Sequence, residues 1–475
     1  MRIQITNGTV FPMDRGAGIP RRADVFIENG RLAAVGPGEP PFELRPGDRQ
    51  IDAEGCYVLP GFVNAHGHLS LGLFRGLGEF AAGSSWESHF ARQGALSEQL
   101  VDADYFLGAQ LLIAEMIRAG ITSFADIHYE PPGSPPVTDL IAQAVEATGI
   151  RATVCLETMG YLNTGGMQLK YDPQEASRTL QNSLAHAEKW HGRADGRITA
   201  MLGLANPPVP MPDDLERVAA AARDSGFPIQ MHLAEIAQEM DEWQDVYGRG
   251  PCEALRDHGL LDHHLLIGNA VFLTERDAEI VRDHPFHATT CPQNCCKIAL
   301  GMLDIPMLLS GGVNVCLGTN EVPNNNNLDM IEEMRFAALY HKLQYGDPRV
   351  LPGDEPLRLI TERGGLALGS GVGVLEPGRP ADVILLDASG PHMHPAHDPL
   401  ANLVYAASSA DVRTVIIDGE IVMEDRRITT FDERAVIEEL ETRLAPLRES
   451  LPEPEHSGGT ESFKVEYEVD RKESL

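Results

Sequence analysis

Eight short apolar runs alternate with stretches that have the spacing of amphipathic helices over residues 58–370 of this sequence. Eight strands alternating with helices predict a closed (β/α)8 barrel of the TIM type. An open, doubly wound sheet is the alternative, but no G-x-G-x-x-G fingerprint follows a strand to favour a dinucleotide fold. The strands are expected at residues 58–63, 122–126, 151–156, 198–204, 228–232, 265–269, 286–290 and 314–317. The helices are expected at residues 98–118, 136–147, 173–190, 213–224, 276–283 and 327–343.

Strand-like sequence with hairpin turns flanks this region on both sides. Asn-Gly separates apolar runs at residues 7–8 and 29–30, and Asp418-Gly419 does the same near the other end of the chain. These dipeptides between alternating runs indicate β-hairpins. We therefore predict a small β-domain in which residues 371–430 complete the sheet begun by residues 1–57, beside a barrel domain of residues 58–370. A helix at residues 433–449 and a mobile tail are expected within residues 431–475.

The composition of the chain indicates which binding partners and which cellular compartment to expect. The chain of 475 residues carries a formal net charge of −32, which repels phosphate backbones and anionic lipids, although so much acid also serves solubility. No apolar run approaches the length that spans a bilayer. Seven cysteines, an odd and sparse count, argue against a disulfide framework and for a reducing compartment. We expect a cytoplasmic protein that acts on a small molecule, with neither nucleic acid nor membrane as a partner.

Two histidines follow the first expected barrel strand. His66 and His68 are separated by one residue, so in an extended chain they point to the same side. Two neutral imidazoles on one side suit a divalent metal such as zinc. The fifth strand ends in His232, and Glu235 follows three residues later, within reach to move a proton between a water molecule and a leaving nitrogen. In a barrel these strand ends meet at one face.

Longer motifs surround these residues and cover nearly the whole chain. They are Leu59-Pro-Gly-Phe-Val-Asn-Ala-His-Gly-His-Leu69, Gly120-Ile-Thr-Ser-Phe-Ala-Asp126, His232-Leu-Ala-Glu235, Leu317-Gly-Thr319 with Asn324-Asn-Asn-Asn-Leu-Asp-Met330, and Gly373-Val-Leu-Glu-Pro-Gly-Arg-Pro-Ala-Asp-Val383. With them the chain resembles the amidohydrolase superfamily, in the subgroup of cytosine-deaminase-like, S-adenosylhomocysteine-deaminase-like and triazine-hydrolase-like enzymes. The resemblance implies a metal-bearing (β/α)8 barrel with a β-sandwich made from both chain ends, and a homodimer.

The resemblance also implies a set of site residues. His66, His68 and His232 match three metal ligands, and Glu235 matches the general acid/base. Two further catalytic positions depart from the family pattern, because Asn269 replaces a strand-six histidine and Asn320 replaces a strand-eight aspartate. An asparagine offers a carbonyl oxygen but neither a negative charge nor basicity. The expected divalent metal, zinc, would therefore be held more weakly than in the family, or not at all.

Three replacements for the missing aspartate stay open at this point. Glu321 could enter the site, although strand alternation would point it away unless the backbone turns there. One of the cysteines at 291, 295 and 296 could donate a thiolate, with core packing as the ordinary alternative. In the third case Glu235 acts alone as the base, with a weaker metal or none.

The substrate-binding residues are harder to predict. The glycine-rich stretch 76–86 follows the first strand and ends in Trp86. We interpret it as a lid with an aromatic side chain over a ring-shaped ligand, with an ordinary exposed loop as the alternative. His128, Asn206 and Asn326 are further candidates to line the pocket.

Three hypotheses for function follow from these residues. The first is a metal-dependent hydrolase of a carbon–nitrogen bond, acting by deamination or by amide or ring opening on a small nitrogen-rich molecule. The second is a small-molecule-binding or regulatory protein that keeps the fold without hydrolysis. The third is a rewired enzyme with non-hydrolytic chemistry. Three histidines together with Glu235 favour the first, whereas Asn269 and Asn320 favour the other two.

Overall fold

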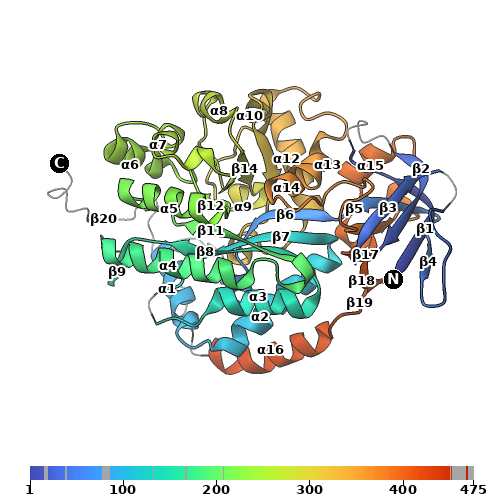
Figure 1. The fold of residues 1–475 in the computed structure, drawn as a ribbon, viewed down its shortest axis with the longest axis horizontal. Coiled ribbons are helices and arrows are strands. Elements are labelled where there is room, and N and C mark those ends of the chain that lie inside the picture. The colour runs from blue at the N-terminus through green and yellow to red at the C-terminus, as the bar shows by residue number, and fades with distance from the viewer. Residues whose placement is uncertain are drawn as a thin grey trace.

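The computed structural model describes residues 1–14, 20–37, 40–77, 86–131, 133–165, 168–206, 208–449, 451 and 467–468, with side chains omitted at 86–91 and 163–168. Figure 1 shows a barrel surrounded by helices, with a β-domain at one end that holds strands from both ends of the chain. The predicted fold class is confirmed. Most of the tail within residues 451–475, expected to be mobile, lies outside the described residues.

The barrel is an eight-stranded parallel sheet in the order β15-β14-β13-β12-β11-β8-β7-β6. It closes where Gly67 of β6 bridges to Asn320 after β15. The backbone N–H groups of Thr319 and Asn320 both donate to His66 O, each at 3.1 Å. The strands are β6 (Phe62–Gly67), β7 (Ile121–His128), β8 (Arg151–Thr158), β11 (Ile198–Leu204), β12 (Ile229–His232), β13 (Leu265–Gly268), β14 (Phe286–Thr290) and β15 (Asn314–Leu317).

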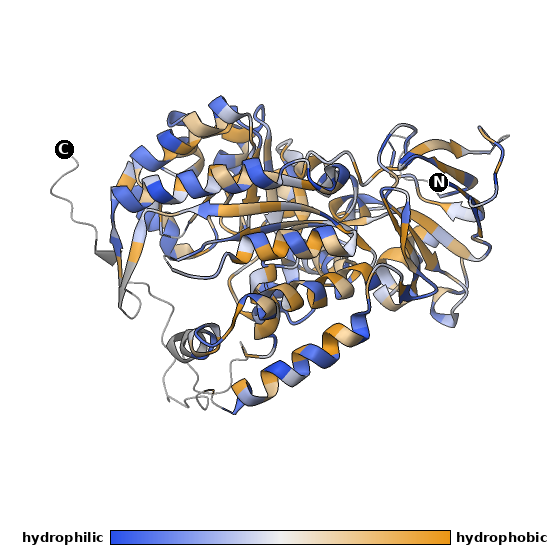
Figure 2. Cartoon of the chain, turned by 60° about the horizontal axis from the view of Figure 1, so that its bottom comes forward, coloured by the Kyte–Doolittle hydropathy of each residue, from blue (hydrophilic) through white to orange (hydrophobic). Residues whose placement is uncertain are grey.

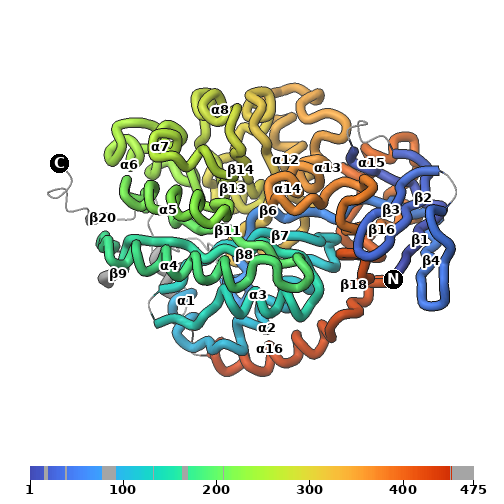
Figure 3. The backbone as a smooth tube through the Cα atoms, viewed as in Figure 1, coloured from blue at the N-terminus to red at the C-terminus, as the bar shows by residue number. Residues whose placement is uncertain are grey.

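The β-domain is built on a nine-stranded sheet, mostly antiparallel, that joins the two ends of the chain. Strand β5 pairs antiparallel with β16, so that Leu59 lies opposite Ile384. Figure 3 shows the blue strands β1 to β4 from the start of the chain at the same end of the molecule as the red strand β18. The strands are β1 (Arg2–Val10), β2 (Arg21–Glu28), β3 (Arg31–Gly36), β4 (Arg49–Asp52), β5 (Cys56–Pro60), β16 (Val383–Asp387), β17 (Val412–Ile417), β18 (Glu420–Glu424) and β19 (Arg427–Ile428).

The strand expected at residues 58–63 is two strands. β5 belongs to the small sheet and β6 to the barrel, so the expected domain boundary at residue 57 falls inside β5. Gly61 separates the two strands, and its N–H donates to Asp382 O of the small domain at 3.0 Å. A Cβ at this position would lie 2.1 Å from the Thr122 side chain, so only glycine fits between the two sheets.

The helices that cover the barrel have local signals at their ends. Asp172 accepts a hydrogen bond from Gln174 N at the start of α4, and Gly149 and Gly226 end α3 and α5 in the left-handed conformation. The longer helices are α1 (Trp86–Ser97), α2 (Asp102–Arg118), α3 (Val137–Thr148), α4 (Pro173–Trp190), α5 (Pro212–Ser225), α6 (Ala237–Tyr247), α12 (Met330–Tyr345) and α16 (Glu433–Arg448). Shorter ones are α7 (Pro251–Asp257), α8 (Glu275–Val281), α9 (Pro292–Lys297), α10 (Ile305–Ser310), α11 (Val322–Asn325), α13 (Glu355–Leu359), α14 (Glu362–Ala367) and α15 (Pro399–Tyr405).

Helix α16 packs along the outside of α2 and has one apolar and one charged face (Figure 2). Val436, Leu440 and Leu444 form its buried side. A hairpin of β9 (Tyr161–Gly165) and β10 (Gln168–Tyr171) follows β8, and β20 (Tyr467–Glu468) pairs with it. No helix in the described part of the chain is both long and apolar enough to cross a membrane.

The barrel interior is packed at one end. A cluster of Val63, Ala65, Ala125 and Ile127 is covered by Ala367, which follows the barrel strands in sequence. Ala367 lies at the end where the strands begin, because His264 Nε2, one residue before β13, lies 2.7 Å from Ala367 O. The opposite end, where the strands finish, is therefore the place left for a cavity.

Candidate active site

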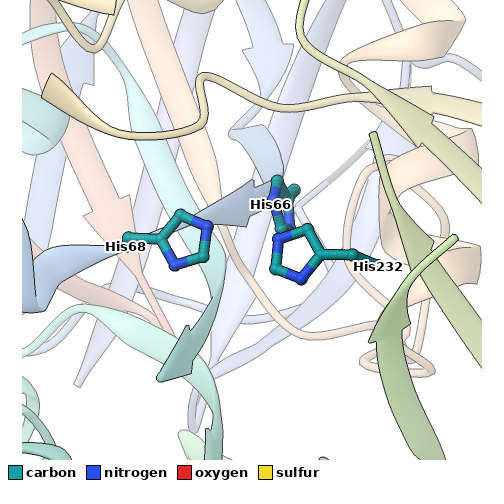
Figure 4. A group of neighbouring side chains, drawn as sticks. All are labelled: His66, His68 and His232. Carbon is teal, nitrogen blue, oxygen red and sulfur yellow. The ribbon is translucent and has the colours of Figure 1, made fainter. Parts of the chain in front are cut away.

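Three histidines meet at the C-terminal ends of the barrel strands. His66 and His68 come from the end of β6, and His232 is the last residue of β12. One ring nitrogen of each lies within 4.8 Å of the others. In Figure 4 the side chains of His68 and His232 approach each other from opposite sides, and His66 completes the group. A single divalent ion can be held by three imidazoles in such an arrangement.

The surroundings of His66 fit a metal. Neither ring nitrogen of this fully buried residue has a hydrogen-bond partner among the residues that the structure describes. Two glycines make room for it, because a Cβ on Gly268 would lie 2.5 Å from its ring and one on Gly318 would lie 2.6 Å from its carbonyl oxygen. A buried imidazole without any partner is costly unless a ligand satisfies it. The geometry therefore fits a group that accepts nitrogen ligands.

The other two rings are oriented by hydrogen-bonding neighbours. His68 Nδ1 lies 2.8 Å from Ile127 O, so it carries the proton and leaves Nε2 for a metal. His232 Nδ1 lies 3.7 Å from the carboxylate of Glu157, at the end of β8. A carboxylate behind a ligand histidine raises the basicity of the ring.

Burial and neighbouring charge set the protonation of these rings. Burial lowers the pKa of His66 well below its ordinary value and that of His68 to about 3, and His232 adds to both effects. Burial also disfavours charge on His232, but the Glu157 and Glu235 carboxylates outweigh it and raise its pKa to about 9. Two rings are thus neutral and ready to bind a metal, whereas the third must first lose a proton.

Glu235 lies beside the three rings on the loop after β12. Asn269 Nδ2 donates to its Oε1 at 2.8 Å, so the expected strand-six position does contact the expected acid/base. Burial raises the pKa of Glu235 above its ordinary value, and the charge of Glu239 adds to this effect. A raised pKa favours the protonated carboxyl group, which is the form that can give a proton to a leaving nitrogen.

A second carboxylate, Glu239 of α6, holds this loop from beneath. It is fully buried, and its Oε1 accepts from Ala234 N at 2.6 Å, Asn206 Nδ2 at 2.7 Å and Trp243 Nε1 at 2.9 Å. Its Oε2 accepts from Glu235 N at 2.8 Å. Asn206 Nδ2 also donates to His232 O at 2.9 Å. The pair Glu239 and Asn206 thus fixes the backbone that carries both a ring ligand and the acid/base.

The strand-eight position has the amide expected from the sequence, but the backbone turns there. Asn320 follows β15 with a φ of 56°, a left-handed conformation that asparagine tolerates better than most residues. The next side chain, Glu321, therefore faces the cavity. Asn324 Nδ2 donates a short hydrogen bond to Glu321 Oε1.

The candidate cysteines do not replace the missing metal ligand. Within the described chain, the cluster that could hold a metal contains only the three histidines, so neither Glu321 nor a cysteine joins it. Cys291 and Cys295 are buried and Cys296 is exposed, and none of them lines the cavity. Burial raises the pKa of the Cys291 thiol well above its usual range and that of Cys295 to about 12. These thiols fit core packing better than metal binding.

A cavity of about 590 Å³ opens above the histidines. Glu157, Glu235 and Glu321 supply three carboxyl groups to its wall, and Phe272 supplies an aromatic ring. No lysine or arginine lines it among the described residues. The remaining lining residues are His68, Met159, Ala205, Asn206, His232, Ile236, Ala237, Gln238, Ile298, Ala299, Leu300, Asn320 and Asn324.

The expected substrate-binding residues are only partly brought together. Asn206 lines the cavity, but its amide N–H groups are used by His232 O and Glu239. His128, at the end of β7, and Asn326, which accepts from Lys297 Nζ, are not part of the described lining. The proposed lid falls mostly on residues 78–85, outside the described residues, and so does the side chain of Trp86.

Sequence reasoning missed Glu157, Phe272 and Glu239. Glu157 stands at the end of an expected strand, so its position was a usable signal. Glu239 lies four residues after Glu235, and this spacing does not reveal that its side chain bonds back to the loop.

Three imidazoles and a carboxyl group at the open end of a barrel define an enzyme with a divalent metal centre.

Comparisons with known proteins give the family. A model of the amidohydrolase family matches residues 57–422. A 5-methylthioadenosine/S-adenosylhomocysteine deaminase of Pelotomaculum thermopropionicum is 38% identical over 94% of this chain and 98% of that protein. A 5'-deoxyadenosine deaminase of Methanosarcina mazei is 36% identical over 92% of this chain and 96% of that protein. An adenosine deaminase of Xanthomonas campestris with bound zinc has a TM-score of 0.82 at 25% identity, over 94% of this chain and 98% of its own.

The chain belongs to the amidohydrolase family, and it is a hydrolase of carbon–nitrogen bonds other than peptide bonds. The family resemblance in the sequence is thereby confirmed, as is the expected reaction class.

Proposed function

We propose that the protein is a zinc-dependent deaminase of an uncharged nitrogen heterocycle, with 6-aminopurine nucleosides as the first class to test. The observation that carries the proposal is the convergence of three imidazoles beside a half-buried carboxyl group: His68, His232 and Glu235 line the cavity, and His66 lies with them. Relatives named as deaminases of 5-methylthioadenosine, S-adenosylhomocysteine and 5'-deoxyadenosine support the choice of substrate.

The residues of this chain have distinct tasks in such a reaction. His66, His68 and His232 would hold the metal, which supplies the activation of a water molecule when bound. Glu235 gives a proton to the departing amino group, and Asn269 keeps the Glu235 carboxyl group in place through its 2.8 Å hydrogen bond. Phe272 offers an apolar ring against which a flat heterocycle can pack.

The charge of the cavity wall selects among nucleosides. Three carboxyl groups line the cavity, and no described lining residue carries a guanidinium or ammonium group. A phosphate or an amino-acid carboxylate on the substrate would meet no cationic side chain there. We therefore expect 5'-deoxyadenosine and 5'-methylthioadenosine to be better substrates than S-adenosylhomocysteine or adenosine monophosphate.

The test is ammonia release from these four compounds by the zinc-loaded protein, with Glu235→Gln as the control. General acid–base catalysis contributes about 100- to 10,000-fold, so the control should lose that much of kcat. Release from the neutral nucleosides at a higher kcat/KM supports the proposal. No release from any of the four, by protein that carries zinc, overturns it.

A second function is favoured by Asn269 and Asn320, which lack the basicity of the residues they replace. In that case the cavity binds a nucleoside without hydrolysing it. Calorimetric binding of 5'-deoxyadenosine with no release of ammonia over several hours would support this second function.

A further inference from the structure

The proposed reaction moves two protons in opposite directions. The attacking water loses one, and the departing nitrogen gains one. Glu235 lines the cavity and is held by Asn269, so it is placed to serve the nitrogen. The amide of Asn320 cannot accept the other proton. With Glu235 assigned to the nitrogen, the group that accepts the proton of the water is to be sought among the other described residues of the cavity wall.

Two carboxylates of the wall remain, and they differ in what already occupies them. Glu157 lies 3.7 Å from His232 Nδ1, where it orients a ring of the metal centre. Glu321 forms no ion pair within the described part of the chain, and its described hydrogen bond comes from the neutral amide of Asn324 to Oε1. No described residue bonds to its Oε2. Glu321 is thus the carboxylate with a free oxygen on the cavity wall.

The backbone explains how Glu321 reaches the wall. In a regular strand the side chains of residues 320 and 321 would point to opposite sides. The left-handed conformation of Asn320 reverses this, and the turn is held in place by hydrogen bonds. Asn320 N donates to His66 O at 3.1 Å, and Asn325 Nδ2 donates to Thr319 O at 2.7 Å. Helix α11 then begins directly after Glu321.

We infer that Glu321 is the catalytic base that replaces the missing strand-eight carboxylate, an inference that rests on the proposed deamination. Its carboxylate accepts a proton as the water oxygen forms its bond to the ring carbon. The carbon–nitrogen bond breaks, and the Glu235 carboxyl group gives its proton to the nitrogen, which leaves as ammonia. The proton on Glu321 returns to Glu235 through solvent, so both groups regain their starting states.

Two properties suit Glu321 to this task. Burial raises the pKa of Glu321 to about 7, near the value that serves a base best at neutral pH. Glu321 also stands outside the cluster of metal ligands found in the described chain. Its removal should therefore slow the reaction without releasing the metal.

The test compares three variants, each analysed for zinc by plasma mass spectrometry and for kcat and KM with 5'-deoxyadenosine. Glu321→Gln keeps the shape and the hydrogen bond to Asn324 but cannot accept the proton. It should retain zinc and KM and lose about 100- to 10,000-fold in kcat. Glu279→Gln, on the exposed face of α8, is the matched control and should behave as wild type. The double variant Asn320→Asp/Glu321→Gln returns a carboxylate to position 320 and should recover kcat at least in part.

The outcomes are distinguishable. Wild type that carries zinc but releases no ammonia overturns the proposed function, and the inference with it. Active wild type with an unchanged kcat in Glu321→Gln overturns the inference alone. Loss of zinc in Glu321→Gln also overturns it, because Glu321 would then be a metal ligand. A double variant that holds zinc and stays as slow as Glu321→Gln shows that the two positions do not share one role.

Discussion

The buried carboxylate of Glu239 gives a sharp test of how the site is positioned. Glutamine at this position keeps the size of the side chain but offers one oxygen instead of two. Three donors share Oε1, namely the N–H groups of Ala234, Asn206 and Trp243, whereas Oε2 serves Glu235 N alone. The amide oxygen should therefore take the place of Oε1, and the NH2 group should face Glu235 N–H.

The expected cost of Glu239→Gln follows from that single lost bond. A buried donor without an acceptor costs about 1–3 kcal/mol, so the free energy of unfolding should fall by that amount in a urea titration. The Glu235 backbone is displaced at the same time, and a shift near 1 Å in a reacting group costs about 100-fold in rate. We expect kcat to fall about 100-fold with KM and zinc content unchanged.

Trp243→Phe is the matched control for this variant. It removes one donor to Glu239 Oε1 and leaves the bond from Oε2 to Glu235 N intact. It should lower the free energy of unfolding by about 1 kcal/mol and leave kcat near wild type. Equal losses of kcat in the two variants would refute the reasoning, because the effect would then come from general loosening and not from Glu235.

Two further predictions concern protonation and stability. His232 is protonated below its pKa of about 9, whereas zinc binds the neutral ring, so zinc affinity should fall about tenfold per pH unit as pH drops below 9 and stay level above it. The number of protons released on zinc binding can be measured by calorimetry at pH 7 in buffers of different ionisation enthalpy. Wild type should release about one more proton than Glu157→Gln, and equal release would contradict this prediction. Arg151 forms a buried ion pair with Asp382 at 3.0 Å that joins the barrel to the β-domain. Arg151→Ala should lower the free energy of unfolding by about 3–5 kcal/mol in urea, compared with about 0–1 kcal/mol for Arg349→Ala at the surface, and a smaller loss for Arg151→Ala than for Arg349→Ala would refute the assignment.

The barrel was predictable because its strands are short apolar runs separated by long helices. The expected strands at 198–204, 286–290 and 314–317 have the observed bounds. The break between β5 and β6 was missed although Pro60-Gly61 marks it, because the apolar residues on both sides of this dipeptide merge into one buried run. Short helices such as α7, with seven residues, present too few turns for a clear period.

The site was predictable where spacing decides geometry. His66 and His68 converge because alternate residues of a strand share a side, and His232 joins them because parallel strands end at one face of the barrel. Glu321 and Glu239 depend on features that no pattern reveals. The first reaches the cavity only because Asn320 is left-handed, and the second acts through bonds to a loop. The predicted homodimer stays a prediction, which light scattering can test.

The most direct test of a metal-dependent hydrolase is the metal content of the purified protein. Plasma mass spectrometry should be applied to wild type and to His66→Ala after dialysis against zinc and then against buffer. Three converging imidazoles predict about one zinc per chain in wild type and a large loss in the variant. Wild type without metal, or a variant that keeps all of it, would contradict the account.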